Sequence, residues 1–149
     1  MNRFRLVTLW IGLTAILPAT GCGRSDDSPV AAVRHFLEVM ERSRDQGPAL
    51  REAFHLLEAS AQAALIRRAE RASTLSGRPY EPYQMLAQGR FVLRFTPASP
   101  RGMTERVQGD RAVVTVTGPR SSDRAEIPLV REAGRWRIQL AIPPMRNEG

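Results

Sequence analysis

The spacing of apolar positions changes once along this chain. Between residues 29 and 86, apolar side chains recur every three or four positions, which is typical of amphipathic helices. From residue 91 onward they alternate with polar ones, which is typical of strands with one buried face. Helices first and a strand meander afterwards predict an α+β fold, in which the helices cover one face of an antiparallel sheet.

The first part is predicted to form three helices. Ser28 followed by Pro29 is typical of a helix start, because the hydroxyl accepts a backbone hydrogen bond and proline fits the first turn. Ser60 is expected to cap the third helix in the same way. The expected helices cover residues 29–46, 48–57 and 60–76, followed by a helical turn over 81–86.

The second part is predicted to form four strands separated by glycine-containing turns and loops. Pro128 is the misfit, because a proline donates no hydrogen bond to a neighbouring strand; we therefore expect a bulge or a sheet edge there. The expected strands cover residues 91–95, 112–116, 125–129 and 136–142, with a loop over 97–103 and turns at Gly109-Asp110 and Ala133-Gly134.

The N-terminus has the layout of an export signal. Arg3 and Arg5 precede an uncharged, mostly apolar stretch over 6–17, which is shorter than the ~20 residues of a membrane-spanning helix. Residues 17–22, Leu-Pro-Ala-Thr-Gly-Cys, resemble the lipobox of bacterial lipoproteins. The resemblance implies that Cys22 is lipidated and becomes the first mature residue. An ordinary signal peptidase would cut the same bond and leave a free thiol.

The leader also predicts an address and an organisation. Gly23, rather than Asp, follows the cysteine, which resembles the default signal for the outer membrane. We therefore expect a lipid-anchored protein of the bacterial cell envelope, on the outer membrane and facing the periplasm. The expected organisation is a signal peptide over 1–21, a tether over 22–28, one α+β domain over 29–144 and a polar tail over 145–149.

Composition narrows the chemistry. The chain carries 22 basic and 15 acidic side chains, a net charge of +7, and every basic residue is arginine. Export makes nucleic acid an unsuitable partner in spite of this charge. A single cysteine, no lysine and two histidines exclude a disulfide framework, a cysteine-held cluster and Schiff-base chemistry. We therefore expect no metal and no cofactor.

Two segments carry a family resemblance. Residues 109–116 and 128–138, together with the opening amphipathic helix, look like the nuclear transport factor 2-like superfamily and its small bacterial lipoproteins. The resemblance implies a curved sheet that wraps around the first helices to form a cone with an apolar cavity. Many members place a β-hairpin before the position of Phe91, where this chain is predicted to be helical. The fold hosts enzymes, binders and scaffolds alike.

Apolar and aromatic side chains are candidates for lining such a cavity, although ordinary core and rim packing is the simpler explanation for them. His35 and His55 are expected to be partly exposed on helices, and no aspartate is placed as a buried general base. The candidate lining residues are Phe36, Met40, Tyr83, Phe95 and Trp136.

Arginines alternate with apolar residues on two expected strands and would share the sheet face opposite the core. This arrangement fits either a plain polar surface or a patch for anionic headgroups or an acidic partner. The patch residues are Arg90, Arg94, Arg135 and Arg137.

The function that these features favour is a lipid-anchored, non-catalytic binding or accessory module, with an envelope protein or a small apolar ligand as partner. The alternative is a cone-fold enzyme, of the isomerase or dehydratase kind, acting on a small apolar substrate. A third interpretation is a structural envelope protein with a filled cone. An enzyme needs a buried carboxylate or histidine beside the cavity, whereas a binder needs only apolar walls or an exposed patch.

Overall fold

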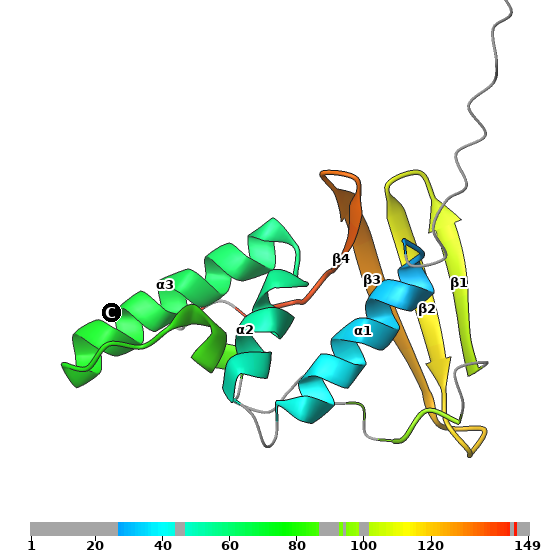
Figure 1. Ribbon diagram of the computed structural model, residues 1–149, viewed down its shortest axis with the longest axis horizontal. Coiled ribbons are helices and arrows are strands. Elements are labelled where there is room, and N and C mark those ends of the chain that lie inside the picture. Colours follow the sequence, from blue (N-terminus) through cyan, green and yellow to red (C-terminus); the bar gives the residue numbers. More distant parts are fainter. Residues whose placement is uncertain are drawn as a thin grey trace, which may run out of the picture.

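The computed structural model describes residues 27–43, 47–86, 93, 95–98, 102–143 and 145. Three α-helices pack with a four-stranded antiparallel sheet, which confirms the α+β class (Figure 1). The signal peptide, Cys22, Arg90 and Arg94 lie outside the described residues. The elements are α1 (Pro29–Arg42), α2 (Gly47–His55), α3 (Ala59–Ser76), a 3-10 helix η1 (Pro82–Leu86), β1 (Met103–Gln108), β2 (Arg111–Thr117), β3 (Arg124–Glu132) and β4 (Arg135–Ile138).

The sheet is a simple meander in which each strand pairs with the next one along the chain. Two-residue turns join β1 to β2 and β3 to β4. Gly109 has a φ of 59°, and Ala133 and Gly134 have φ values of 49° and 78°. Positive φ angles give short turns the twist that antiparallel strands need, so both turns bring their strands directly into register.

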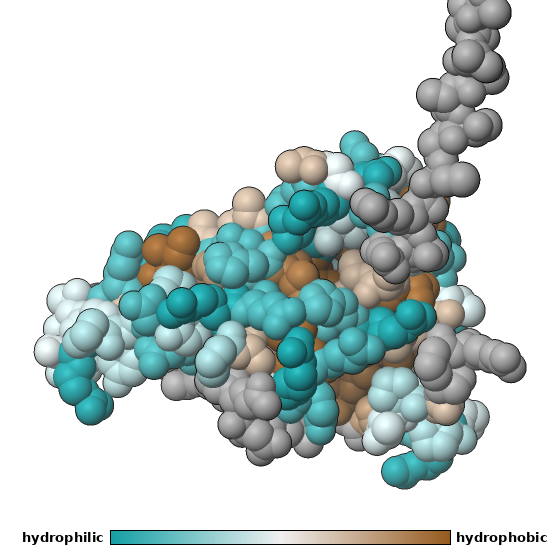
Figure 2. Space-filling view, in the orientation of Figure 1, coloured by the Kyte–Doolittle hydropathy of each residue, from teal (hydrophilic) through white to brown (hydrophobic). Residues whose placement is uncertain are grey.

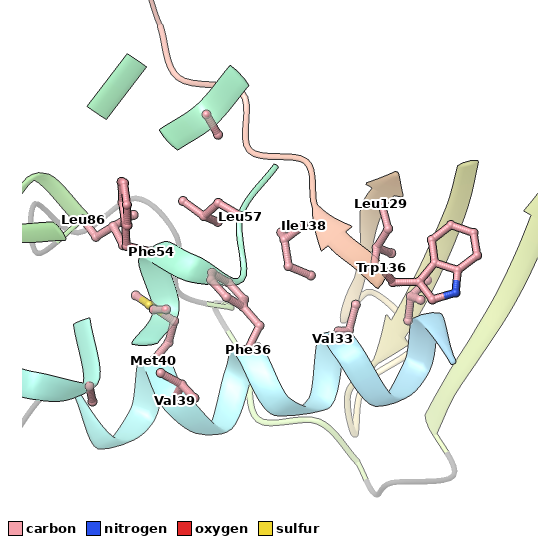
Figure 3. Close-up of a cluster of buried hydrophobic side chains, with 14 of the residues drawn as sticks. Val33, Phe36, Val39, Met40, Phe54, Leu57, Leu86, Leu129, Trp136 and Ile138 are labelled. Atoms are coloured by element: carbon pink, nitrogen blue, oxygen red, sulfur yellow. The ribbon is translucent and has the colours of Figure 1, made fainter. Parts of the chain in front are cut away.

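One face of the sheet packs against α1 and forms the core. The inward-facing residues of β2 and β4 are buried, as is Leu129 of β3, and Val114 and Leu129 are fully buried. Figure 3 shows Val33 of α1 lying toward Leu129 and Trp136, while Met40 lies toward Phe54 and Leu86 at the other end of the cluster. The solvent side of α1 is charged, and Figure 2 shows hydrophilic side chains along it. This division follows from the apolar stripe of the helix.

The link between α2 and α3 is attached to the free edge of β4. Ile138 donates its N–H to the carbonyl of Leu56 and accepts from the N–H of Glu58, both at 3.0 Å. Leu57, between them, forms an isolated parallel bridge with Ile138 and is fully buried. The sheet thus holds the end of α2 and the start of α3 beside β4.

Carboxylates from the sheet satisfy the starts of two helices. Glu132 of β3 accepts the N–H of Ala59 at 3.1 Å, and Glu105 of β1 accepts the N–H of Val30 at 3.0 Å. Neither helix has an acidic residue in its own first turn. Ser28 also caps α1 as predicted, by accepting the N–H of Ala31 at 3.1 Å.

Several predicted boundaries were wrong. The first helix ends at Arg42, with Ser43 as its C-cap, rather than at residue 46. Glu58, not Ser60, occupies the N-cap position of α3, because the carboxylate of Glu132 supplies the hydrogen bond that a cap would give. The second helix ends at His55 because Leu57 is taken up by its bridge to β4.

The first predicted strand was also misplaced. Leu93 and Phe95, the described residues of the expected strand over 91–95, are not in a strand. The edge strand is β1 instead. Its first residue, Met103, was predicted to end a loop, and no element was predicted for residues 104–108. Five of its six residues are exposed, so it carries little of the alternation that predicts a strand.

Pro128 shows how β3 accommodates a proline without the expected bulge. The register between β2 and β3 runs unbroken through the Val113–Pro128 pair. The carbonyl of Pro128 accepts from the N–H of Gln139 at 2.9 Å, so its nitrogen also faces the β4 side. β4 ends at Ile138, one residue before the position where the missing N–H would be needed, which makes β4 shorter than the predicted 136–142.

Candidate functional site

The candidate site lies where β4 meets α2. Trp136 and Ile138 of β4 are buried on the core face, so Arg135 and Arg137, which alternate with them, project to the outer face of the sheet. α2 runs beside this edge because of the Leu57 bridge. An open depression of about 660 Å³ lies between the two elements. We call it the α2–β4 depression; its lining residues are Pro48, Arg51, Glu52, His55, Leu56, Gln62, Arg135 and Arg137.

Contacts of their guanidinium groups hold two of its arginines in place. The guanidinium of Arg51 lies over the ring of Tyr83, 5.0 Å from the ring centroid. Arg137 donates a hydrogen bond from Nη1 to the backbone carbonyl of His55, the last residue of α2. A cation is favoured at a helix C-terminus, where carbonyl groups lack partners. Arg135 is exposed, and its side chain makes no hydrogen bond or ion pair within the described residues.

The one acid of the depression is already engaged. Glu52 contacts His35 and Arg42, each at 3.1 Å from a carboxylate oxygen, so its charge is shared with two groups of α1. Three arginines and a single, partly neutralised carboxylate therefore line the depression. Guanidinium groups form paired hydrogen bonds with carboxylate and phosphate oxygens, so the depression is suited to an anionic group.

Arg51 is a candidate site residue that the sequence pattern did not indicate. It lies on α2 with Pro48, Glu52 and His55 at spacings of three and four residues, which places all four on one side of the helix. The prediction of this helix rests on its apolar side. The charged residues of its polar side are visible in the sequence, but nothing in the sequence indicates that this side faces β4.

The five predicted cavity residues belong to the core region. Phe36, Met40 and Trp136 are buried, while Tyr83 and Phe95 are half-buried and pack against them. None of the five lines the α2–β4 depression. That they line an apolar cavity stays a prediction, as does the patch role of Arg90 and Arg94.

The titratable groups lie at the surface of the described part of the chain. His35 and His55 are exposed on their helices, as predicted. Among the described residues no polar or charged residue is buried, and no three metal-ligating side chains lie together. No described helix is both long enough and apolar enough to cross a membrane.

No family model, curated protein or solved structure matches this chain. The resemblance to the nuclear transport factor 2-like superfamily therefore stays a prediction.

Proposed function

We propose that this protein is a lipid-anchored, non-catalytic binding module of the bacterial cell envelope, and that the α2–β4 depression takes an anionic group of its ligand or partner. The observation that carries the proposal is that Arg51 of α2 lines the same depression as Arg135 and Arg137 of β4. These residues are more than 80 positions apart in the sequence, and separate contacts hold Arg51 and Arg137 in place.

The sequence supports the anchor. Cleavage at the lipobox-like residues 17–22 would make Cys22 the new N-terminus, and Gly23 in the next position favours the outer membrane. The six residues over 22–27 reach at most ~20 Å, so the domain would lie close to the bilayer on the periplasmic side. Multiple acyl chains on one residue anchor a protein stably, whereas a single chain does so only marginally.

The finer fold that we propose is the cone of the nuclear transport factor 2-like superfamily. The order of elements supports it, because helices come first and an antiparallel meander follows, with α1 lying along one sheet face. Arginines of the outer face would then stand on the outside of the cone.

Binding of small soluble anions tests this function. We expect inorganic phosphate and a triglutamate peptide, titrated in low salt, to shift the NMR signals of Arg51, Arg135 and Arg137. Replacing Arg51 or Arg135 by Gln should weaken binding about three- to tenfold, because each removes one charge-assisted contact. Arg124→Gln is the matched control, since Arg124 is on the outer face of β3 but already pairs with Glu126 at 3.0 Å.

Equal affinity in all variants would contradict the proposal. So would an equal loss on replacing Arg124, because the effect would then follow overall charge rather than the depression.

A further inference from the structure

The outer face of the sheet carries more arginine than the depression alone uses. Strand register places Arg111 of β2 and Arg137 of β4 in one row, with Val130 of β3 between them. Neighbouring strands are about 4.8 Å apart, so these two arginines stand roughly 10 Å apart on one side of the sheet. Arg135, two residues before Arg137 on β4, lies on the same side of the sheet.

The next row gives this face an apolar centre. Arg106 of β1 pairs with Val113, which pairs with Pro128. Val113 and Val130 are half-buried, and Pro128 is exposed. We call this surface the arginine face: four arginines around three apolar residues. Its members are Arg106, Arg111, Arg135, Arg137, Val113, Pro128 and Val130.

The two acids of the outer strand faces have partners other than the four arginines. Glu126 pairs with Arg124 at 3.0 Å, and Glu132, directly across from Arg135 in the strand register, accepts the first N–H of α3. Arg106 and Arg111 are exposed and make no ion pair within the described residues. The arginine face is thus positively charged. Arg106, Arg111 and Arg135 are available for anionic groups outside the chain, whereas Arg137 already donates to the carbonyl of His55.

The first described residues lie at the end of the sheet that carries the β1–β2 and β3–β4 turns (Figure 1). Asp27, five residues after Cys22, pairs with Arg131 of β3 at 3.2 Å. The start of α1 and both two-residue turns lie at this end (Figure 1). Arg111 and Arg135 are the first residues after those turns. A tether of at most ~20 Å therefore keeps these two arginines within reach of the membrane that would hold Cys22.

We propose that the arginine face rests on the anionic phospholipid headgroups of the membrane to which the protein is anchored. The proposal rests on the anchor of the proposed function and deepens it by naming a lipid surface as partner. The arginines of this face would bind the phosphate oxygens of the headgroups. The three apolar residues between them would lie against the lipid surface and exclude water. Each arginine near an anionic membrane strengthens binding by about fivefold, so four of them orient an already anchored domain.

Arginine-specific footprinting tests the proposal on the full protein isolated from membranes and reconstituted into vesicles. Phenylglyoxal labels exposed arginines, and peptide mass mapping then gives each labelling rate. We expect Arg106, Arg111 and Arg135 to react about fivefold more slowly in vesicles with phosphatidylglycerol than in pure phosphatidylcholine. Arg67 and Arg71, exposed on α3, and Arg120, with 82% of its side chain exposed, serve as internal controls.

Equal labelling in both vesicles would overturn the proposal, and so would slowing at Arg67 and Arg71 instead, because α3 would then face the lipid. The same digest reports the mass of the N-terminal peptide. If Cys22 is unmodified, the anchor fails separately. The single thiol then allows coupling to a maleimide lipid, after which the same footprint tests the arginine face alone.

A pair of variants separates the arginine face from the depression. Arg106→Gln with Arg111→Gln should abolish the lipid-dependent slowing at Arg135, because two of the four rim charges are lost. Binding of inorganic phosphate should stay unchanged, since neither residue lines the depression. Arg67→Gln with Arg71→Gln removes the same charge from α3 and should leave the footprint intact. A footprint that survives in the first variant would contradict the proposal.

Discussion

The two faces of the sheet use the same strands for opposite purposes. On the inner face, Val114, Leu129 and Ile138 are packed against α1 and lose nearly all contact with solvent. On the outer face, their chain neighbours Val113, Val130 and Arg137 remain partly accessible. Alternation therefore stabilises the domain through one face of the sheet and leaves the other face free to carry charge.

The largest expected effect separates the two faces with neighbouring valines. Val114→Ala should lower the free energy of unfolding by about 2–3 kcal/mol, because buried methyl groups are lost and a cavity remains. Val113→Ala, one residue away on the outer face, should cost less than about 1 kcal/mol. Urea unfolding measures both, and similar losses would mean that the outer face is also packed.

The next comparison concerns two glutamates of β3. Glu132→Ala should cost about 1 kcal/mol of unfolding free energy, because the first N–H of α3 loses its partner. Glu126→Ala, six residues earlier on the same strand, removes only an exposed pair with Arg124 and should cost a few tenths of a kcal/mol. Equal losses from the two substitutions would show that the contact of Glu132 with Ala59 does not stabilise α3.

The two arginines of β4 should separate binding from stability. Arg137→Gln removes the hydrogen bond to the carbonyl of His55 and should cost about 0.5–1 kcal/mol of unfolding free energy. Arg135→Gln should leave unfolding unchanged. Both should weaken phosphate binding in a calorimetric titration. A stability loss with Arg135, or unchanged binding with either variant, would contradict the account of the depression.

The smallest expected effect has the opposite sign. Glu52→Gln removes the one negative charge of the depression and should strengthen phosphate binding about two- to threefold. Glu70→Gln, on the exposed side of α3, is the control and should change nothing. Weaker binding in the Glu52 variant would mean that this carboxylate positions the arginines rather than opposing the anion.

The sequence predicts the inner half of the fold better than the outer half. Buried positions such as Val33 and Trp136 follow the helical and strand periods, because burial demands apolar side chains at regular spacing. β1 escapes prediction since five of its six residues are exposed. Pairing with β2 forms that strand, and no local pattern encodes it.

The candidate site was predicted only in part for a related reason. Arg135 and Arg137 are predicted on the outer face because they alternate with Trp136 and Ile138. Their meeting with Arg51 depends on the bridge between Leu57 and Ile138, a contact between residues 81 positions apart. The hydrophobic period indicates which side of a helix or strand is exposed to solvent. It does not indicate which other element packs beside that side.

The mass of the mature N-terminal peptide tests directly whether this protein is anchored to the membrane by lipid, on which the proposed function depends. The protein is isolated from membranes of its native host, with a Cys22→Ser variant as control, and the N-terminal peptide is identified by mass spectrometry. The account predicts a peptide that begins at Cys22 and carries acyl chains, and no such species in the variant. An unmodified peptide from the soluble fraction would contradict it.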